Sequence, residues 1–247
     1  MNVYYMTIIK YISLGHRCHI GQILSLNKLR IEAFPFDSII YSFEGIIDCF
    51  QNNFINFFPK EIICEYVFVG KSNPEADENG NRKLFRGKYG AFTHHNLDVP
   101  VIIDSFKKRI QRLTNFLSVT NDEVIFLRTV MDDNEVDLLD KFINVISYTY
   151  PNLKFRLFLI YDNKYMPESI LKYNDYVYIV NSIMITLDQN NKTNHTSYSY
   201  LFNYLSNITK IDDIKIEELY NNYGLPFKND SYKGYAITNL LPYNLNN

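Results

Sequence analysis

The second half of this 247-residue chain alternates short apolar runs with longer amphipathic segments. Strands are expected at 124–127, 155–161 and 176–180, and a helical pattern at 135–147 separates the first two. Strands separated by about ten to fifteen residues of helical pattern are typical of βαβ units, whose mostly parallel sheet has helices on both faces. We therefore predict a three-layer, Rossmann-like α/β fold.

The remaining segments extend this pattern over the whole chain. A strand is expected at 4–14, and after Gly15 the apolar spacing changes to that of a helix. Further helices are expected at 43–54, 103–117, 167–173, 198–207 and 211–223. The polar segment 70–90 predicts a loop, either a lid or the tip of a long hairpin. Because no linker or repeat divides the sequence, we expect a single α/β domain over 1–247.

The composition limits the partners that the chain can have. Its net charge of −2 gives no general positive field, so we expect neither nucleic acid nor an anionic membrane as a partner. The three cysteines form no C-x-x-C pair, and their odd number favours a reducing, cytoplasmic compartment over a disulfide framework. We expect a peptide or small-molecule substrate, no cofactor and no metal, and a protein partner stays open.

Polar residues stand where the predicted strands end. These residues are Gly15, Arg17 and Cys18, then His94, His95 and Asn96, then Arg128, and finally Asp162. Ligands of open parallel sheets bind at the carboxyl ends of the strands, where loops and helix N-termini converge. If the strands are parallel neighbours, a thiol, an imidazole, a guanidinium and a carboxylate share one rim. Those groups are the ones that nucleophilic acyl transfer uses.

Cys18 is the most suggestive of these residues because it stands at the start of a predicted helix. Unpaired N–H groups and the helix dipole at such a position favour a thiolate. The alternative is a structural role, since cysteine is among the most buried residue types. Cys49 and Cys64 have apolar neighbours, and we expect both in the core.

The doubled histidine, His94 and His95, has three interpretations: catalytic base, metal ligand or structural residue. Neighbouring residues of an extended segment point to opposite faces, so at most one of these rings faces a shared site. The sequence has no HExxH motif and no Cys/His cluster, which disfavours the metal interpretation. We expect His19 on the solvent face of the first helix.

Two arginines are candidate substrate-binding residues. Arg30 and Arg128 could bind a carboxylate or a phosphate, or could form structural pairs with Asp37 and Asp162. The basic residues of 107–112 lie opposite apolar ones on a predicted helix, which predicts a solvated face.

Several motifs together resemble a known family. The segment Ser13–Cys18, continued by Pro35-Phe36-Asp37, resembles the opening motif of the papain-like cysteine peptidases that form a domain of unknown function in bacteria and large DNA viruses. His95-Asn96-Leu97 is similar to the family's His-Asp-Phe-like element, and Phe126–Thr129 is similar to its Phe-Ile-Arg-Thr strand. The resemblance covers roughly residues 10 to 165.

The resemblance implies a Cys18 nucleophile and a histidine base. The base is His95, with His94 as the alternative because the doubled histidine leaves the register open. Asn96 stands where the family has an acid, and either Asn96 or Asp37 would orient the imidazole, as an asparagine does in papain-like triads.

The family name also implies a different fold. A papain-like α+β fold combines a helix that carries the cysteine with an antiparallel barrel that carries the histidine, whereas the periodicity predicts a parallel sheet. Ser38 also departs from the family, which usually has an aromatic residue there. Two rival functions stay open: a Rossmann-like protein or transferase that binds a sugar or nucleotide, and a non-catalytic protein that uses its aromatic residues for contacts.

Overall fold

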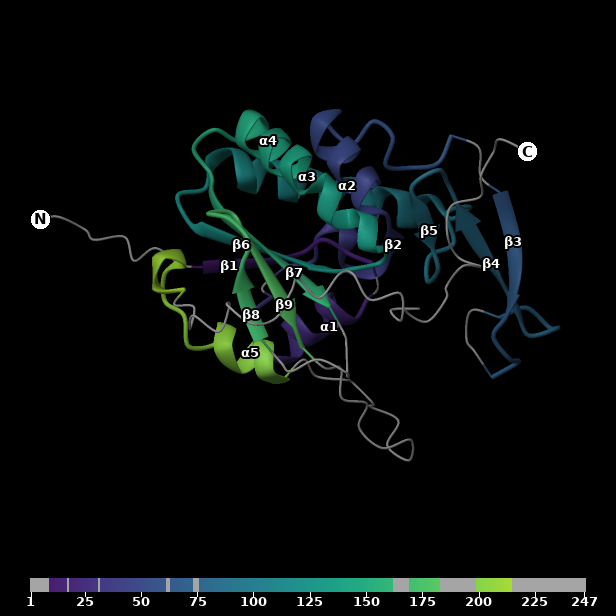
Figure 1. Ribbon diagram of the computed structural model, residues 1–247. Coiled ribbons are helices and arrows are strands. Elements are labelled where there is room, and N and C mark those ends of the chain that lie inside the picture. Colours follow the sequence, from purple (N-terminus) through teal and green to yellow (C-terminus); the bar gives the residue numbers. More distant parts are fainter. Residues whose placement is uncertain are drawn as a thin grey trace, which may run out of the picture.

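The computed structural model describes residues 9–16, 18–30, 32–60, 63–72, 76–161, 169–182 and 199–214. Its α-helices are α1 (His19–Leu26), α2 (Phe43–Gln51), α3 (Pro100–Val119), α4 (Leu139–Thr149) and α5 (Ser199–Leu205). Short 3₁₀ helices are η1 (Pro35–Ser38), η2 (Asp133–Leu138) and η3 (Ile211–Asp213). Two separate sheets hold the strands (Figure 1).

The main sheet has five strands in the order β1-β6-β7-β9-β8. They are β1 (Ile9–Ser13), β6 (Glu123–Thr129), β7 (Lys154–Tyr161), β9 (Val177–Asn181) and β8 (Ser169–Lys172). Neighbouring pairs from β1 to β9 are parallel, and β8 is antiparallel to β9. The prediction of a mostly parallel α/β sheet is therefore confirmed.

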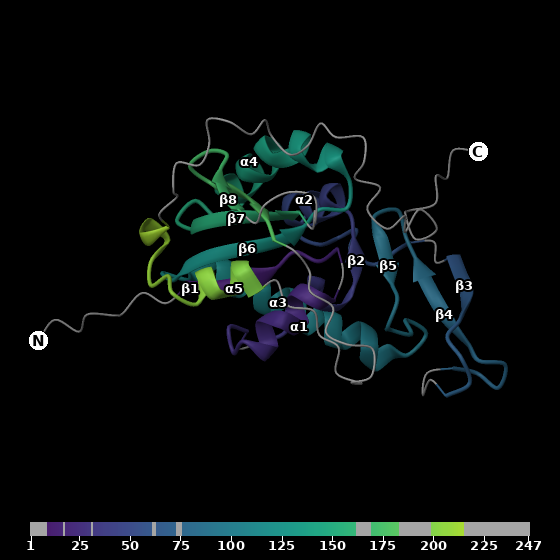
Figure 2. The same ribbon diagram turned by 60° about the horizontal axis from the view of Figure 1, so that its bottom comes forward.

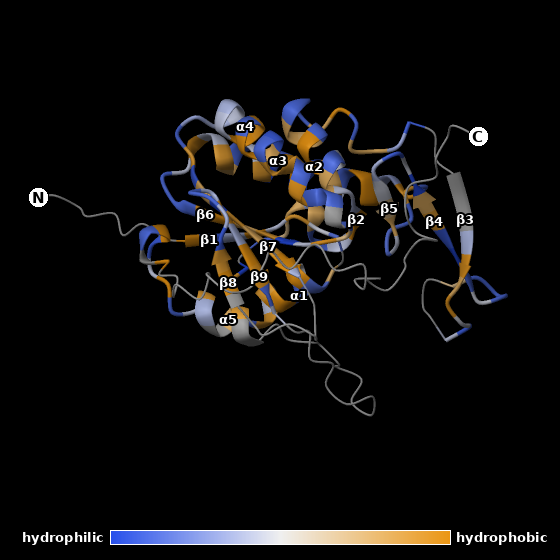
Figure 3. Cartoon of the chain, in the orientation of Figure 1, coloured by the Kyte–Doolittle hydropathy of each residue, from blue (hydrophilic) through white to orange (hydrophobic). Residues whose placement is uncertain are grey.

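Helices cover both faces of the main sheet (Figures 1 and 2). In β6, Val124 and Phe126 belong to the core cluster that contains the apolar faces of α2 and α4. The alternate residues Ile125 and Leu127 belong to a second cluster that contains α1 and α5. Because both sets are apolar, β6 buries hydrophobic residues on both of its faces, and Figure 3 shows orange segments in the strands of the main sheet.

The small sheet is antiparallel, in the order β2-β5-β4-β3. Its strands are β2 (Ile40–Tyr41), β3 (Ile63–Phe68), β4 (Asn81–Arg86) and β5 (Gly90–Phe92). The views in Figures 1 and 2 place it beyond the ends of β6 and β7. The sequence pattern did not predict this sheet as a whole, because β2 and β5 have only two and three residues and pair through a few of them.

The polar segment predicted at 70–90 includes the tip of the β3–β4 hairpin. Val69 N–H and Gly80 C=O form a 2.8 Å hydrogen bond across its base, and Gly80 has a φ of 82°. The Asp77 carboxylate accepts hydrogen bonds from the N–H groups of Asn79 and Asn81. The described part of the segment therefore matches the hairpin interpretation.

The helix predicted at 167–173 is wrong, because Ser169–Lys172 forms the edge strand β8. A tight turn follows this strand. In the turn, the Asn174 side chain accepts hydrogen bonds from the N–H groups of Tyr176 and Val177, both at 2.8 Å. This turn folds the segment back along β9, so strand pairing outweighs the local helical pattern.

The other predicted helices differ mainly in where they begin and end. The helix predicted at 135–147 is a 3₁₀ turn, η2, followed by α4. The tail helix predicted at 211–223 begins with η3, and the rest lies outside the described residues, as does the first part of the strand predicted at 4–14. In the part of the chain that the structure describes, no helix has the length and apolar character needed to cross a membrane.

A single buried arginine joins the two sheets. Arg128, at 0% exposure near the end of β6, donates to the Leu14 carbonyl at 3.0 Å and to the Tyr41 carbonyl of β2 at 2.8 Å. Its remaining donors form a bidentate pair with Glu135 of η2, at 3.0 and 2.5 Å. The guanidinium therefore fixes β1, β2, β6 and η2 relative to one another.

We expect Glu135→Gln to destabilise the fold by about 3 kcal/mol, because it leaves a buried guanidinium without its counter-charge while the amide still accepts one hydrogen bond. The control is Asp104→Asn, since Asp104 pairs with Lys107 at 3.8 Å on an exposed helix surface. That change should cost less than about 1 kcal/mol. Urea unfolding curves measure both, and equal losses would contradict the role given to Arg128.

Candidate functional site

The turn between β1 and α1 places Cys18 at the start of a helix. Gly15 and His16 have left-handed φ values of 75° and 79°, which reverse the chain within a few residues of the strand. Cys18 is the N-cap of α1, and its carbonyl accepts the N–H of Gln22 at 3.0 Å. The predicted strand, turn and helix are therefore all present, while Arg17 lies outside the described residues.

Gly15 is needed at this turn for two reasons. Its φ of 75° is one that other residues rarely adopt, and a Cβ atom there would stand 3.2 Å from the Phe36 carbonyl oxygen. The turn therefore packs directly against η1. Gly15 shapes the backbone below Cys18, and it does not line the pocket described next.

Cys18 lines a pocket of about 300 Å³ between α1 and the small sheet. The polar lining residues are Cys18, His19, Ser38, Arg82, Thr93 and His94, and the apolar ones are Ile39, Ile40, Val67 and Leu84. The structure thus brings together the predicted thiol and one predicted histidine, His94. His19, expected on the solvent face, is half-buried and lines the same pocket.

His94 and His95 follow a strand of the small sheet. The prediction that they end a strand of the parallel sheet is therefore wrong. Residues 94 and 95 come directly after β5, which pairs with β2 and β4 and not with the parallel strands. The thiol and the imidazole therefore come from different sheets. Cys18 and His94 line the same pocket because the small sheet stands at the carboxyl end of the main one (Figure 1).

His95 has a different environment from His94. Its Nε2 atom is 2.8 Å from the Ser38 hydroxyl, which also accepts a hydrogen bond from Arg109 of α3 at 3.1 Å. The ring meets the Phe106 ring edge to face, with centroids 4.9 Å apart. Arg109 was predicted on a solvated face, but it is half-buried and turned towards η1.

Asp37 closes η1 through its contacts with Phe34 and Arg30. Its carboxylate accepts the Phe34 N–H at 2.8 Å and pairs with Arg30 at 3.0 Å. Burial raises the pKa of Asp37, and the hydrogen bond from Phe34 and the charge of Arg30 offset this only in part. The structural pair is therefore the observed state of Arg30 and Asp37.

Asn96 caps a local turn after the histidines. It is exposed, and its side-chain oxygen accepts the N–H of Asp98 at 2.9 Å. That oxygen is the atom which would orient an imidazole in a papain-like triad. In this structure the Asn96 side-chain oxygen is hydrogen-bonded to the Asp98 backbone.

Arg128 and Asp162 do not form the predicted part of the rim. Arg128 is fully buried and uses its donors on Leu14, Tyr41 and Glu135, so its environment is that of a structural residue. Asp162 lies outside the described residues, so its position stays a prediction. The sequence suggested Asp162 as the acidic partner of Arg128, and the acidic partner that the structure gives is Glu135.

The pattern in the sequence gave no reason to select Ser38 and Arg109. They are separated by 71 residues and meet only because α3 packs beside η1. Ser38 differed from the family motif, and that difference was the one available indication. Pairing between distant elements, not local spacing, brings these residues together.

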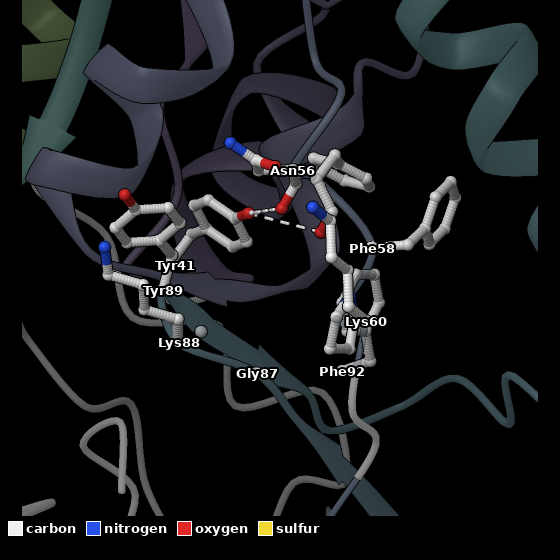
Figure 4. Close-up of a pocket in the computed structure, with 11 residues that line it drawn as sticks. Tyr41, Asn56, Phe58, Lys60, Gly87, Lys88, Tyr89 and Phe92 are labelled. Carbon is white, nitrogen blue, oxygen red and sulfur yellow. Dashed lines mark hydrogen bonds between the residues drawn. The ribbon is translucent and has the colours of Figure 1, made fainter. Parts of the chain in front are cut away.

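A second pocket, of about 380 Å³, lies between the α2–β3 connection and the β4–β5 turn (Figure 4). Tyr89 and Lys88 stand on one side of it, and Phe58, Lys60 and Phe92 on the other. Its described lining includes no cysteine, serine or histidine. Chemistry by a nucleophile and a base is therefore assigned to the Cys18 pocket.

The metal interpretation of the histidines gains no support from the geometry. Within the described ranges, no group of three or more His, Cys, Asp and Glu side chains is placed to hold a metal ion.

Comparison with known proteins identifies one related family. A family model described as "Putative papain-like cysteine peptidase (DUF1796)" matches residues 9–164. The match confirms the resemblance expected from the motif around Cys18. No curated protein and no solved structure matches the chain.

We expect Gly15→Ala to cost more stability than Gly70→Ala. Both glycines have left-handed φ values, 75° and 87°, so each change should cost about 1–2 kcal/mol from backbone strain. A Cβ atom at Gly70 meets nothing within 4 Å, whereas one at Gly15 crowds η1. Denaturant unfolding measures the difference, and equal losses would show that the turn does not depend on this contact.

We expect Asp37→Asn to remove part of the pH dependence of stability. A carboxyl whose pKa is raised in the folded state stabilises the fold below its ordinary value of 3.8, and this contribution is lost as the pH rises through the raised value. The stability of the wild type relative to the variant should therefore fall over that window, as urea unfolding at stepped pH measures. A relative gain would mean that pairing with Arg30 dominates over burial.

Proposed function

This chain belongs to the family of putative papain-like cysteine peptidases, and from that membership and the pocket we propose that it is a cysteine-dependent hydrolase acting on peptide bonds. The observation that carries the proposal is that Cys18, at a helix start, and His94 line one pocket. Cys18 is the nucleophile and His94 is the base. We prefer His94 to His95 because the Nε2 atom of His95 is engaged by Ser38.

The position of Cys18 suits a nucleophile. The first helical hydrogen bond of α1 runs from Gln22 to Cys18, so the three N–H groups before Gln22 have no partner within the helix. Such groups favour a thiolate and can also hold the oxyanion of a tetrahedral intermediate. No hydrogen bond from the Cys18 side chain caps the helix, so this side chain does not take up those groups.

The proposed reaction has two stages. The Cys18 sulfur attacks the peptide carbonyl while His94 takes the thiol proton, and His94 then gives that proton to the departing amine. Water, deprotonated by His94, hydrolyses the resulting thioester. The apolar lining residues Ile39, Ile40 and Leu84 favour an apolar substrate side chain, and Arg82 supplies a positive charge at the same pocket.

We expect iodoacetamide to alkylate Cys18 and not Cys49 in the folded protein. Cys49 is 0% exposed, and burial raises its pKa to about 12, so it has almost no thiolate at pH 8. Mass spectrometry of a Cys64→Ser variant locates the label without interference from the third thiol. Labelling of Cys49 at the rate of Cys18 would contradict the proposed exposure of the site.

We expect Cys18→Ala to abolish hydrolysis of a fluorogenic peptide library, and His94→Ala to lower kcat/KM by about 10²–10⁴, the usual contribution of a general base. His95→Ala is the matched control and should retain much more activity. Cooperative thermal unfolding of each variant confirms that it is folded. Full peptide hydrolysis by folded Cys18→Ala would rule the mechanism out, and loss with His95→Ala alone would assign the base to His95.

A further inference from the structure

Ser38 lines the Cys18 pocket and is hydrogen-bonded to His95, which is not the histidine proposed as the base for Cys18. Ser38 ends η1 and is half-buried. Its Oγ atom lies 2.8 Å from His95 Nε2 and 3.1 Å from Arg109 Nη1. The three side chains come from η1, the segment after β5, and α3.

The direction of one of these hydrogen bonds follows from what Arg109 can donate, and the direction of the other depends on the tautomer of His95. Arg109 can only donate, so it uses a lone pair of the Ser38 oxygen. When His95 Nε2 carries no hydrogen, it accepts the hydroxyl hydrogen of Ser38. This tautomer makes Ser38 the donor and leaves the ring hydrogen of His95 on Nδ1. This is the arrangement in which an imidazole takes a proton from a nucleophilic hydroxyl.

One aromatic ring holds both partners of Ser38 in place. Phe106, 1% exposed on α3, contacts the edge of the His95 ring at an interplanar angle of 90°. The guanidinium of Arg109 lies over the same ring, 5.1 Å from its centroid. Phe106 thereby restricts the imidazole and the guanidinium to a fixed geometry around the Ser38 oxygen.

We propose that Ser38 is a second nucleophile of this pocket, which cleaves carboxylic esters with His95 as its base. The Ser38 oxygen forms a bond to the ester carbonyl carbon, its proton passes to His95 Nε2, and the carbonyl electron pair moves onto the oxygen. That pair returns as the bond to the alcohol oxygen breaks, and His95 gives its proton to the departing alkoxide. Water then hydrolyses the acyl-serine by the same sequence, and free Ser38 and a carboxylic acid result.

Arg109 and the apolar wall define the rest of the site. The guanidinium beside the Ser38 oxygen stabilises the negative charge that develops there as the proton leaves. The pocket volume of about 300 Å³ and its lining by Ile39, Ile40 and Leu84 suit a short apolar acyl group. An ester needs a less powerful leaving-group acid than an amide, and it is therefore the substrate class chosen for this pair.

The activity of Ser38 does not depend on the thiol, so the two proposals can fail separately. The test uses Cys18→Ala, in which the peptidase chemistry is absent by design. A fluorophosphonate, which phosphonylates activated serines, is applied to this variant, and the labelled residue is identified by mass spectrometry. The expected adduct is on Ser38. Hydrolysis of p-nitrophenyl butyrate by the same variant is the second measurement.

Variants of the pair complete the test. In the Cys18→Ala background, Ser38→Ala should lower the rates of fluorophosphonate labelling and of p-nitrophenyl butyrate hydrolysis at least about 100-fold. His95→Gln in the same background should lower these two rates by about 10²–10⁴. Ser118→Ala is the matched control, since Ser118 is an exposed serine that donates to the Thr114 carbonyl within α3, and it should leave both rates unchanged. Absence of an adduct on Ser38 in folded Cys18→Ala would overturn the proposal. Loss of Cys18 alkylation in Ser38→Ala without any such adduct would also overturn it, because Ser38 would then only position neighbouring groups.

Discussion

The bidentate pair between Arg128 and Glu135 is the contact on which the arrangement of this molecule depends. A guanidinium at 0% exposure is stable only if its charge and its donors are satisfied, and four hydrogen bonds satisfy them here. Two of these go to backbone carbonyls, of Leu14 beyond β1 and of Tyr41 in β2. Satisfying one buried charge therefore fixes the position of the small sheet, and with it the wall that faces Cys18.

The candidate site lies at the junction of two sheets with different architecture. The parallel sheet supplies the turn that carries Cys18, and the antiparallel sheet supplies the segment with His94 and His95. A papain-like fold likewise combines a cysteine at a helix start with a histidine from an antiparallel sheet. The parallel periodicity in the sequence therefore describes the main sheet, while the segment that carries the histidines belongs to the antiparallel sheet.

The sequence predicted the main sheet well because buried parallel strands form continuous apolar runs, as in β6 and β7. It also predicted the turn at Gly15 and the place of Cys18, since both depend on local backbone geometry. It did not predict β2, which has two residues, or the contact between Ser38 and Arg109. The sequence placed Arg128 at the rim of the site because the apolar pattern of β6 shows where the strand ends. The pattern does not show that β2 and η2 pack against that end and bury the side chain.

The pairing of β1 with β6 has a consequence for when the thiol site forms during synthesis. Ile9 pairs with Glu123 and Ser13 with Leu127, so β1 joins a parallel sheet only after β6 has been synthesised. Closing so long a loop is entropically costly and slow compared with forming local contacts. Until then the Cys18 turn has its local contact with η1 but lacks the support of the parallel sheet. The backbone around Cys18 therefore takes its final surroundings late, when β6 has joined β1.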